Sequence, residues 1–281
     1  MKPLMKTRML VGMAKRLTVL WSVLMFFGVL LVALQASAAV IFEDNFDSPT
    51  LGPEWLISPG KGSYSLTANP GHLRYTVDAW CTSRTAGDFL GTHYDKSLWL
   101  VRPFEGQRWV LKTVLTYDLR PSSPTNNRAM FFTVREPGVD GTVLASVARW
   151  VGVNDGNPNS NCLQLYTGDP ADSSTWEFFP NSSGPLLPDN WYFEIERDGD
   201  DITIRASNDG NDSTFEYQHE HTFPAGYLVN AHQDIEIWGM GWRGSNDPPG
   251  YVDFDFITAV PEPGTLCLLA LGGLALLRRR K

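Results

Sequence analysis

The chain has 281 residues, a net charge of −8 and three cysteines. The charge is unevenly spread, because residues 39–259 hold 14 Lys and Arg against 30 Asp and Glu, a balance of −16. A surface this acidic repels phosphate backbones and anionic lipids, so we expect no nucleic acid partner. It suits cation binding, or solubility outside the cell.

The first 38 residues have the composition of a secretion signal. Five basic residues and no acid precede an uncharged stretch at residues 17–34, and Ala36-Ser37-Ala38 fits a small-x-small cleavage site. This order predicts a signal peptide over residues 1–38, with an N-terminal signal helix. Because 18 uncharged residues are long for such a segment, an uncleaved membrane anchor is the alternative.

Residues 39–259 follow the pattern of short strands. Gly, Pro, Asn and Asp recur every 8 to 15 residues between stretches rich in aromatic and β-branched side chains. Alternation, strict over residues 72–78, predicts strands at residues 72–78 and 109–117 and a hairpin at residues 191–207. Further strands are expected at residues 129–135, 143–153, 215–223, 234–238 and 251–257. We therefore predict an all-β fold, a two-sheet antiparallel sandwich.

Three short motifs resemble those of concanavalin A-like, or laminin-G-like, domains. They are Phe42-Glu43-Asp44-Asn45-Phe46-Asp47 with Leu51-Gly52-Pro53-Glu54-Trp55, the hairpin at residues 191–210, and Tyr251-Val252-Asp253-Phe254-Asp255-Phe256-Ile257. The resemblance implies a jelly-roll sandwich over residues 39–259. Its relatives range from lectins to glycosidases, so the fold leaves the function open.

Two carboxylate pairs are the closest approach to a glycosidase site. Glycosidases of this fold carry Glu-x-Asp-x-x-Glu along one strand, and Glu194 with Glu196 and Asp234 with Glu236 match only its spacing of two. Neither pair has the third acid, so we interpret both as the polar faces of strands and predict no catalytic residue. The nearby glycines of Gly239-Met240-Gly241-Trp242-Arg243-Gly244 are interpreted as a loop rather than a nucleotide site, because no helix start follows them.

Tryptophan is abundant, with ten in the chain and nine outside the signal. Exposed aromatic rings stack on the apolar faces of sugars, while Arg, Asp or Asn bind the hydroxyls. We predict a carbohydrate-binding platform at Trp238, Trp242 and Arg243, with Trp80 and Trp99 in reserve. The alternative is that the core buries these rings, as the apolar contexts of Trp109, Trp150 and Trp191 suggest.

Two further features concern stability. Cys81 and Cys162 are the cysteines outside the C-terminal apolar run, and an exported protein could join them in a disulfide; two buried free thiols are the alternative. The first and last strands of this fold family are commonly neighbours, which would bring Asp44 and Asp47 close to Asp253 and Asp255. Such a cluster predicts one structural calcium ion, unless the last two acids simply point outward from their strand.

The last 22 residues form a third segment. Pro261-Glu262-Pro263 is followed by an uncharged run at residues 265–277 and by Arg278, Arg279, Arg280 and Lys281. The run would form a short transmembrane helix of roughly 20 Å at ~1.5 Å per residue. This order resembles the PEP-CTERM sorting signal over residues 260–281, which implies recognition and removal by a membrane protease of the exosortase type. A tail anchor that is never cleaved is the alternative.

These predictions converge on an exported, non-catalytic protein of the cell surface or extracellular matrix. It is transiently anchored in the inner membrane and binds the polysaccharide of a biofilm matrix. A glycoside hydrolase or polysaccharide lyase on the same fold and a purely structural envelope protein are the two alternatives.

Overall fold

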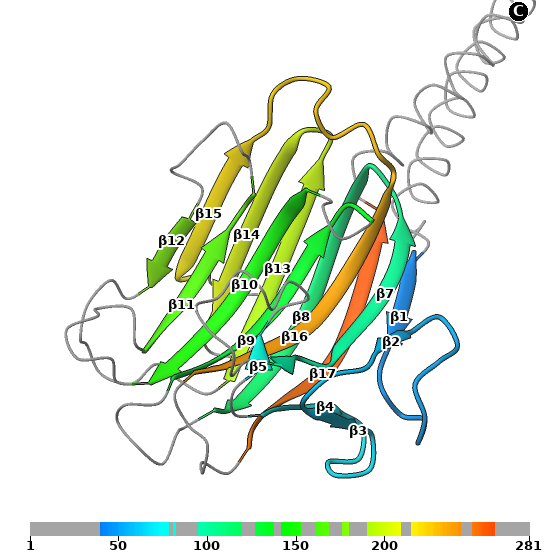
Figure 1. The fold of residues 1–281 in the computed structure, drawn as a ribbon. Coiled ribbons are helices and arrows are strands. Elements are labelled where there is room, and N and C mark those ends of the chain that lie inside the picture. The colour runs from blue at the N-terminus through cyan, green and yellow to red at the C-terminus, as the bar shows by residue number, and fades with distance from the viewer. Residues whose placement is uncertain are drawn as a thin grey trace, which may run out of the picture. The chain divides into compact units, whose positions relative to one another are not determined.

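The computed structural model describes residues 40–78, 81–82, 95–119, 127–137, 142–152, 161–168, 176–179, 190–208, 215–242 and 249–261. These residues form 17 strands and no helix, and 15 of the strands make two antiparallel sheets that lie face to face (Figure 1). The predicted all-β class is confirmed, and the arrangement is consistent with a jelly-roll sandwich. The predicted terminal helices lie outside the described residues, within which no helix is long and apolar enough to cross a membrane.

The eight-stranded sheet contains both the predicted hairpin and the last strand. Its strand order is β15 (Tyr217–Thr222), β14 (Asp201–Ser207), β13 (Asn190–Asp198), β8 (Arg108–Asp118), β17 (Gly250–Pro261), β4 (Leu73–Val77) and β3 (Ser63–Ser65), with β1 (Phe42–Asp44) also on β17. In the hairpin, Ile195 pairs with Ile204 and Phe193 with Ala206, as alternation predicts. Gly199 makes the turn with a φ of 65°, in the left-handed region that glycine enters without strain.

The seven-stranded sheet lies opposite. Its order is β12 (Trp176–Phe179), β11 (Asn161–Tyr166), β10 (Val143–Gly152), β9 (Asn127–Arg135), β16 (His232–Trp242), β7 (Trp99–Glu105) and β2 (Leu56–Ser58). Two short strands, β5 (Cys81–Thr82) and β6 (Asp95–Lys96), pair in parallel apart from both sheets.

Alternation along the strands fills the space between the sheets. Leu73, Tyr75 and Val77 of β4 are fully buried there, as are Ile235 and Ile237 of β16 from the opposite sheet. Successive side chains of a strand point to opposite faces. Because Ile235 and Ile237 point into the core, the residues that alternate with them along β16 point away from it. The outer face of β16 therefore presents Asp234, Glu236, Trp238 and Met240.

Gly239 and Gly241 lie within β16, so their interpretation as a loop is wrong. They alternate with Trp238 and Met240 and so stand on the inward face of the strand. A Cβ atom added to Gly239 would lie 2.7 Å from Val77 Cγ2 and 3.1 Å from the Tyr75 ring. Glycine is needed here for close packing and not for a turn.

Strand β17 crosses the sheet in two halves with different neighbours. Its first half pairs with β8 and β4, and its second half pairs with β8 and β1, after a register shift between Phe254 and Ile257. The first and last strands are thus neighbours, as the family resemblance implied. β17 continues to Pro261, which lies past the boundary at residue 260 that the sequence predicted for the tail.

Candidate functional site

Four aromatic side chains form a row on the outer face of the seven-stranded sheet. Trp238 of β16 stands opposite Trp99 of β7 on one side and Phe131 of β9 on the other. Its ring stacks on Phe131 at 3.8 Å between centroids and on Trp99 at 5.1 Å, each with an interplanar angle of 3°. Trp150 of β10 meets Phe131 edge-on at 5.5 Å. We call Trp99, Trp238, Phe131 and Trp150 the aromatic row.

The aromatic row belongs to a hydrophobic cluster separate from the main core. Ala129, Ala148 and Met240 are buried beside Phe131, and the half-buried Trp150 and Trp238 pack against them. Cross-strand aromatic pairs stabilise a sheet, but an apolar cluster on its outer face has no second sheet to cover it within the described residues. Trp150 and Trp238 keep part of their ring surface accessible, which gives this face two aromatic contact points.

A row of polar side chains runs beside the aromatic row. Register places Glu236, Thr133, Ser146 and Tyr166 side by side on β16, β9, β10 and β11. The Thr133 and Ser146 hydroxyl groups share a hydrogen bond of 2.9 Å, and Arg135 Nη1 lies 3.6 Å from the buried Glu236 carboxylate. We call Glu236, Thr133, Ser146 and Tyr166 the polar row.

Gln164 of β11 lies beside the aromatic row and contacts it through Trp150. Its side-chain oxygen accepts a hydrogen bond of 2.8 Å from Trp150 Nε1, which fixes the orientation of that ring. Trp99 and Phe131 are buried, so the accessible rings are those of Trp150 and Trp238. Aromatic rings next to hydroxyl, amide and charged groups match the two sides of a sugar ring, one apolar and one rich in hydroxyls. This arrangement can bind a carbohydrate chain laid across the strands.

The two carboxylate pairs each share one strand face, as predicted, but their partners differ. Arg205 Nη1 donates bonds of 2.7 Å to both Glu194 and Glu196 on the outer face of the eight-stranded sheet, and Lys112 lies 3.3 Å from Glu194. These contacts identify the first pair as a surface ion-pair network. The second pair lies on the aromatic face, and Asp234 borders a pocket of about 290 Å³ next to Pro103 and Pro137.

The structure describes only some residues of the predicted sugar platform. Trp238 and its reserve Trp99 are in the aromatic row. Trp242 is the last residue of β16, in register with Asn127 of β9, whereas Arg243 and Trp80 lie outside the described residues. Trp109 and Trp191 are core residues, as expected.

Phe131 was not among the predicted binding residues, and Trp150 was assigned to the core. The signal that could have found them is alternation, since Phe132 and Val147 occupy the inward positions and leave Phe131, Ala148 and Trp150 outward. Nothing in the separate strand patterns tells which strands are neighbours, so the row itself could not be foreseen.

The four acids predicted to hold calcium do not gather at one point. The Asp253 carboxylate is buried and accepts two bonds of 2.7 Å from Arg74 and one of 2.9 Å from Asn69. Asp255 is exposed, and its carboxylate lies 3.5 Å from His72. Among the described residues, no group of three or more His, Cys, Asp and Glu side chains could hold a metal ion.

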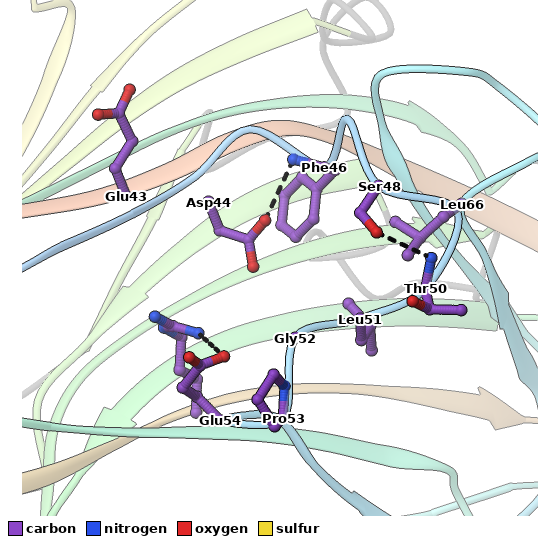
Figure 2. A pocket seen from close by; sticks show the side chains of 11 residues that line it. Glu43, Asp44, Phe46, Ser48, Thr50, Leu51, Gly52, Pro53, Glu54 and Leu66 are labelled. Carbon is purple, nitrogen blue, oxygen red and sulfur yellow. Dashed lines mark hydrogen bonds and ion pairs between the residues drawn. The ribbon is translucent and has the colours of Figure 1, made fainter.

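Asp44 is the last residue of β1, and Asp47 lies in the segment that follows. The Asp44 carboxylate accepts hydrogen bonds from Trp55 Nε1 (2.7 Å) and from the Phe46 amide (3.1 Å), and Asp47 is exposed. Asp44 and Glu54 line one pocket of about 370 Å³. Figure 2 shows these two side chains with Phe46 and Leu66 beside them. The pocket therefore brings Asp44 near Glu54 rather than near the acids of β17.

Cys81 and Cys162 are separate buried thiols, so the predicted disulfide is not formed. Cys81 Sγ lies 3.1 Å from the Asp78 carbonyl and 3.7 Å from that of Gly239 on β16. Cys162 is on β11, which is separated from β16 by β10 and β9. Three strand spacings amount to ~14 Å, whereas a disulfide needs Cα atoms within ~7 Å.

Of the predicted sorting motif, Pro261 is the last residue of β17, opposite Trp109 of β8. Glu262, Pro263 and the basic residues Arg278, Arg279 and Arg280 lie outside the described residues. Residues 259–281 match the family model of the PEP-CTERM protein-sorting motif, which confirms that resemblance and indicates an exported protein.

Solved structures show the same fold at low identity. The chain is similar to the CBM2 module of the evolved Dit of Lactobacillus casei BL23 phage J-1, with 13% identity, 78% of this chain and 94% of that chain covered, and a TM-score of 0.50. It is also similar to the catalytic domain of an endo-1,3-beta-glucanase (laminarinase) from Thermotoga petrophila RKU-1, with 11% identity, 80% and 98% covered, and a TM-score of 0.50. The fold is that of the concanavalin A-like jelly rolls. Comparison with curated proteins finds no match.

Proposed function

We propose that this protein is an exported, non-catalytic polysaccharide-binding protein of the cell surface or extracellular matrix. Its sugar-binding surface is the outer face of the seven-stranded sheet. The observation that carries this proposal is the aromatic row beside the polar row, with Trp150 held in place by Gln164. The partly accessible rings of Trp150 and Trp238 stack on sugar faces, while the half-buried Asp234 on the same face is of a type that binds sugar hydroxyls.

The sorting motif supports export and processing. A basic signal segment, an acidic sandwich and the matched motif at residues 259–281 together fit a protein that leaves the cytoplasm and is processed by an exosortase-type protease. Fractionation of the host tests this part. We expect a chain without residues 1–38 at the surface or in the matrix, and cytosolic full-length chain would contradict it.

Binding is tested with the purified protein by affinity electrophoresis in gels containing laminarin, barley β-glucan, xylan or the exopolysaccharide of the host. We expect at least one neutral polysaccharide to retard migration. Migration that is unchanged in every gel would favour the purely structural alternative.

A glycoside hydrolase is the second candidate function, and one observation favours it. Asp234 and Glu236 share the aromatic face, and Asp234 borders a pocket. Carboxyl groups of glycosidases stand ~5 to 9.5 Å apart, a separation that two residues on one strand face can reach. Against this, Arg135 lies against the Glu236 carboxylate. Reducing-sugar release on the same polysaccharides, lost in Glu236→Gln and in Asp234→Asn, would establish the hydrolase; no release is the result we expect.

A further inference from the structure

The sorting motif and the sandwich share residues. The matched motif begins at residue 259, and β17 ends at Pro261. Ala259, Val260 and Pro261 thus belong to both, so no flexible linker separates the last strand from the motif.

These shared residues are held by neighbouring strands. β8 pairs with all three, Leu111 opposite Ala259, Val110 opposite Val260 and Trp109 opposite Pro261. On the other side of β17, Phe42 of β1 pairs with Ala259, and the Ile41 amide donates a hydrogen bond of 2.8 Å to the Ala259 carbonyl. Ala259 is therefore inside the sheet, and Val260 and Pro261 are held along one edge.

The side chains around this end of β17 are also fixed. Ala259 is fully buried, and so is Trp109, whose indole nitrogen donates a hydrogen bond of 3.1 Å to the Gln233 side chain. Phe104 packs between Phe42 and Trp109, with ring centroids 5.7 and 5.3 Å away. Freeing residues 259–261 would expose part of this cluster to water, which costs free energy.

A protease binds its substrate as an extended chain with free backbone groups on either side of the scissile bond. A chain already paired in a sheet cannot offer them unless the sheet opens locally. In the folded protein, the bonds that precede and follow Val260 are therefore closed to a protease.

We propose that the processing protease cuts this chain on the C-terminal side of Pro261 and that the folded sandwich sets this limit, so that the mature protein keeps all of β17. The step breaks one amide bond: water supplies the hydroxyl group of the new carboxylate and a proton to the amine of the released tail. This inference rests on the proposed removal of the tail.

Mass spectrometry of the processed protein from its host tests the inference. The C-terminal tryptic peptide begins at Gly244, since Arg243 is the last basic residue before Arg278. We expect this peptide to end at Pro261 or at a later residue. A peptide that ends at Val260 or earlier would overturn the inference and leave tail removal established. A chain that keeps residues 262–281 would instead overturn tail removal itself.

A variant tests whether the fold sets the limit. Ile41→Pro removes the amide that bonds to Ala259, whereas Val40→Ala changes a neighbouring half-exposed side chain and keeps every backbone amide. We expect faster tail loss, or new C-termini at residues 259 and 260, in Ile41→Pro and parental behaviour in Val40→Ala. Thermal unfolding of both variants confirms that each is folded. A folded Ile41→Pro variant with parental rate and C-terminus would overturn this role of the fold.

Discussion

Burial controls the chemistry of the two cysteines in the sandwich. Removal from water raises the pKa of Cys81 to about 11 and that of Cys162 to about 12, from an ordinary value of 9.0. Thiolate, the reactive form, is therefore scarce at neutral pH. We expect neither residue to react with iodoacetamide at pH 7.5 until the protein is unfolded, and peptide mapping to show two thiols. A Cys81–Cys162 bridge in the exported protein would contradict the structure.

The raised pKa values of the two thiols also affect the stability of the protein at alkaline pH. Because both folded pKa values lie above the unfolded value, the unfolded chain releases its thiol protons first. The free energy of unfolding should therefore fall as the pH rises from about 9 toward 11, and Cys81→Ser should reduce that slope.

Gly239 shows how one residue controls the distance between the sheets. In Gly239→Ala, the new methyl group would meet Val77 at 2.7 Å, so the sheets must separate locally. We expect a loss of ~1–3 kcal/mol in the free energy of unfolding, measured by urea denaturation. Gly52→Ala is the control, since its methyl group would meet only the movable Glu54 side chain. Equal stability of the two variants would refute the packing argument.

At the scale of elements, the Arg74–Asp253 ion pair joins β4 to β17. Asp253→Asn should lower the free energy of unfolding by about 3 kcal/mol, because it leaves the partly buried Arg74 without its carboxylate. Asp255→Asn should change it by less than ~0.5 kcal/mol, because Asp255 is half exposed. If instead both acids held calcium, the two variants would lose similar stability and EDTA would lower the melting temperature of the parent. We expect EDTA to leave it unchanged.

The strands were predictable to different degrees for physical reasons. β4, β8 and the β13–β14 hairpin alternate strictly or join through a short turn, so local pattern sufficed. β17 was predicted to end at Ile257, whereas it continues to Pro261, the first proline of the sorting motif. β11 was missed although Leu163 and Leu165 alternate with Cys162 and Gln164.

The candidate site could not be predicted from local sequence pattern, because it depends on which strands are neighbours. Trp238 and Trp99 were recognised as candidates one by one, but they are 139 positions apart and become neighbours only because β16 pairs with β7. Phe131 and Trp150 join them through β9 and β10. Local pattern also could not show where the four acids predicted to hold calcium would lie: β1 and β17 are indeed neighbours, but Arg74 of β4 binds the Asp253 carboxylate.

For the whole molecule, the acidity of the sandwich restricts the polysaccharides that it can bind. Residues 39–259 carry a balance of −16, which repels chains rich in uronic acids or sulfate at low ionic strength. We expect binding to a neutral β-glucan that changes little between 20 and 300 mM NaCl, and no binding to alginate at 20 mM. Alginate binding that weakens with salt would show a cationic surface and contradict this expectation.

The proposed polysaccharide-binding function depends most on the aromatic row as the binding surface. The decisive measurement is the dissociation constant for a polysaccharide that retards the parent protein, compared between Trp238→Ala and Tyr227→Ala. Both substitutions remove a partly exposed ring, but Tyr227 lies near Phe223, away from the aromatic row. We predict at least ~10-fold weaker binding for Trp238→Ala and parental binding for Tyr227→Ala, with both variants folded. Parental binding by a folded Trp238→Ala variant would contradict the account.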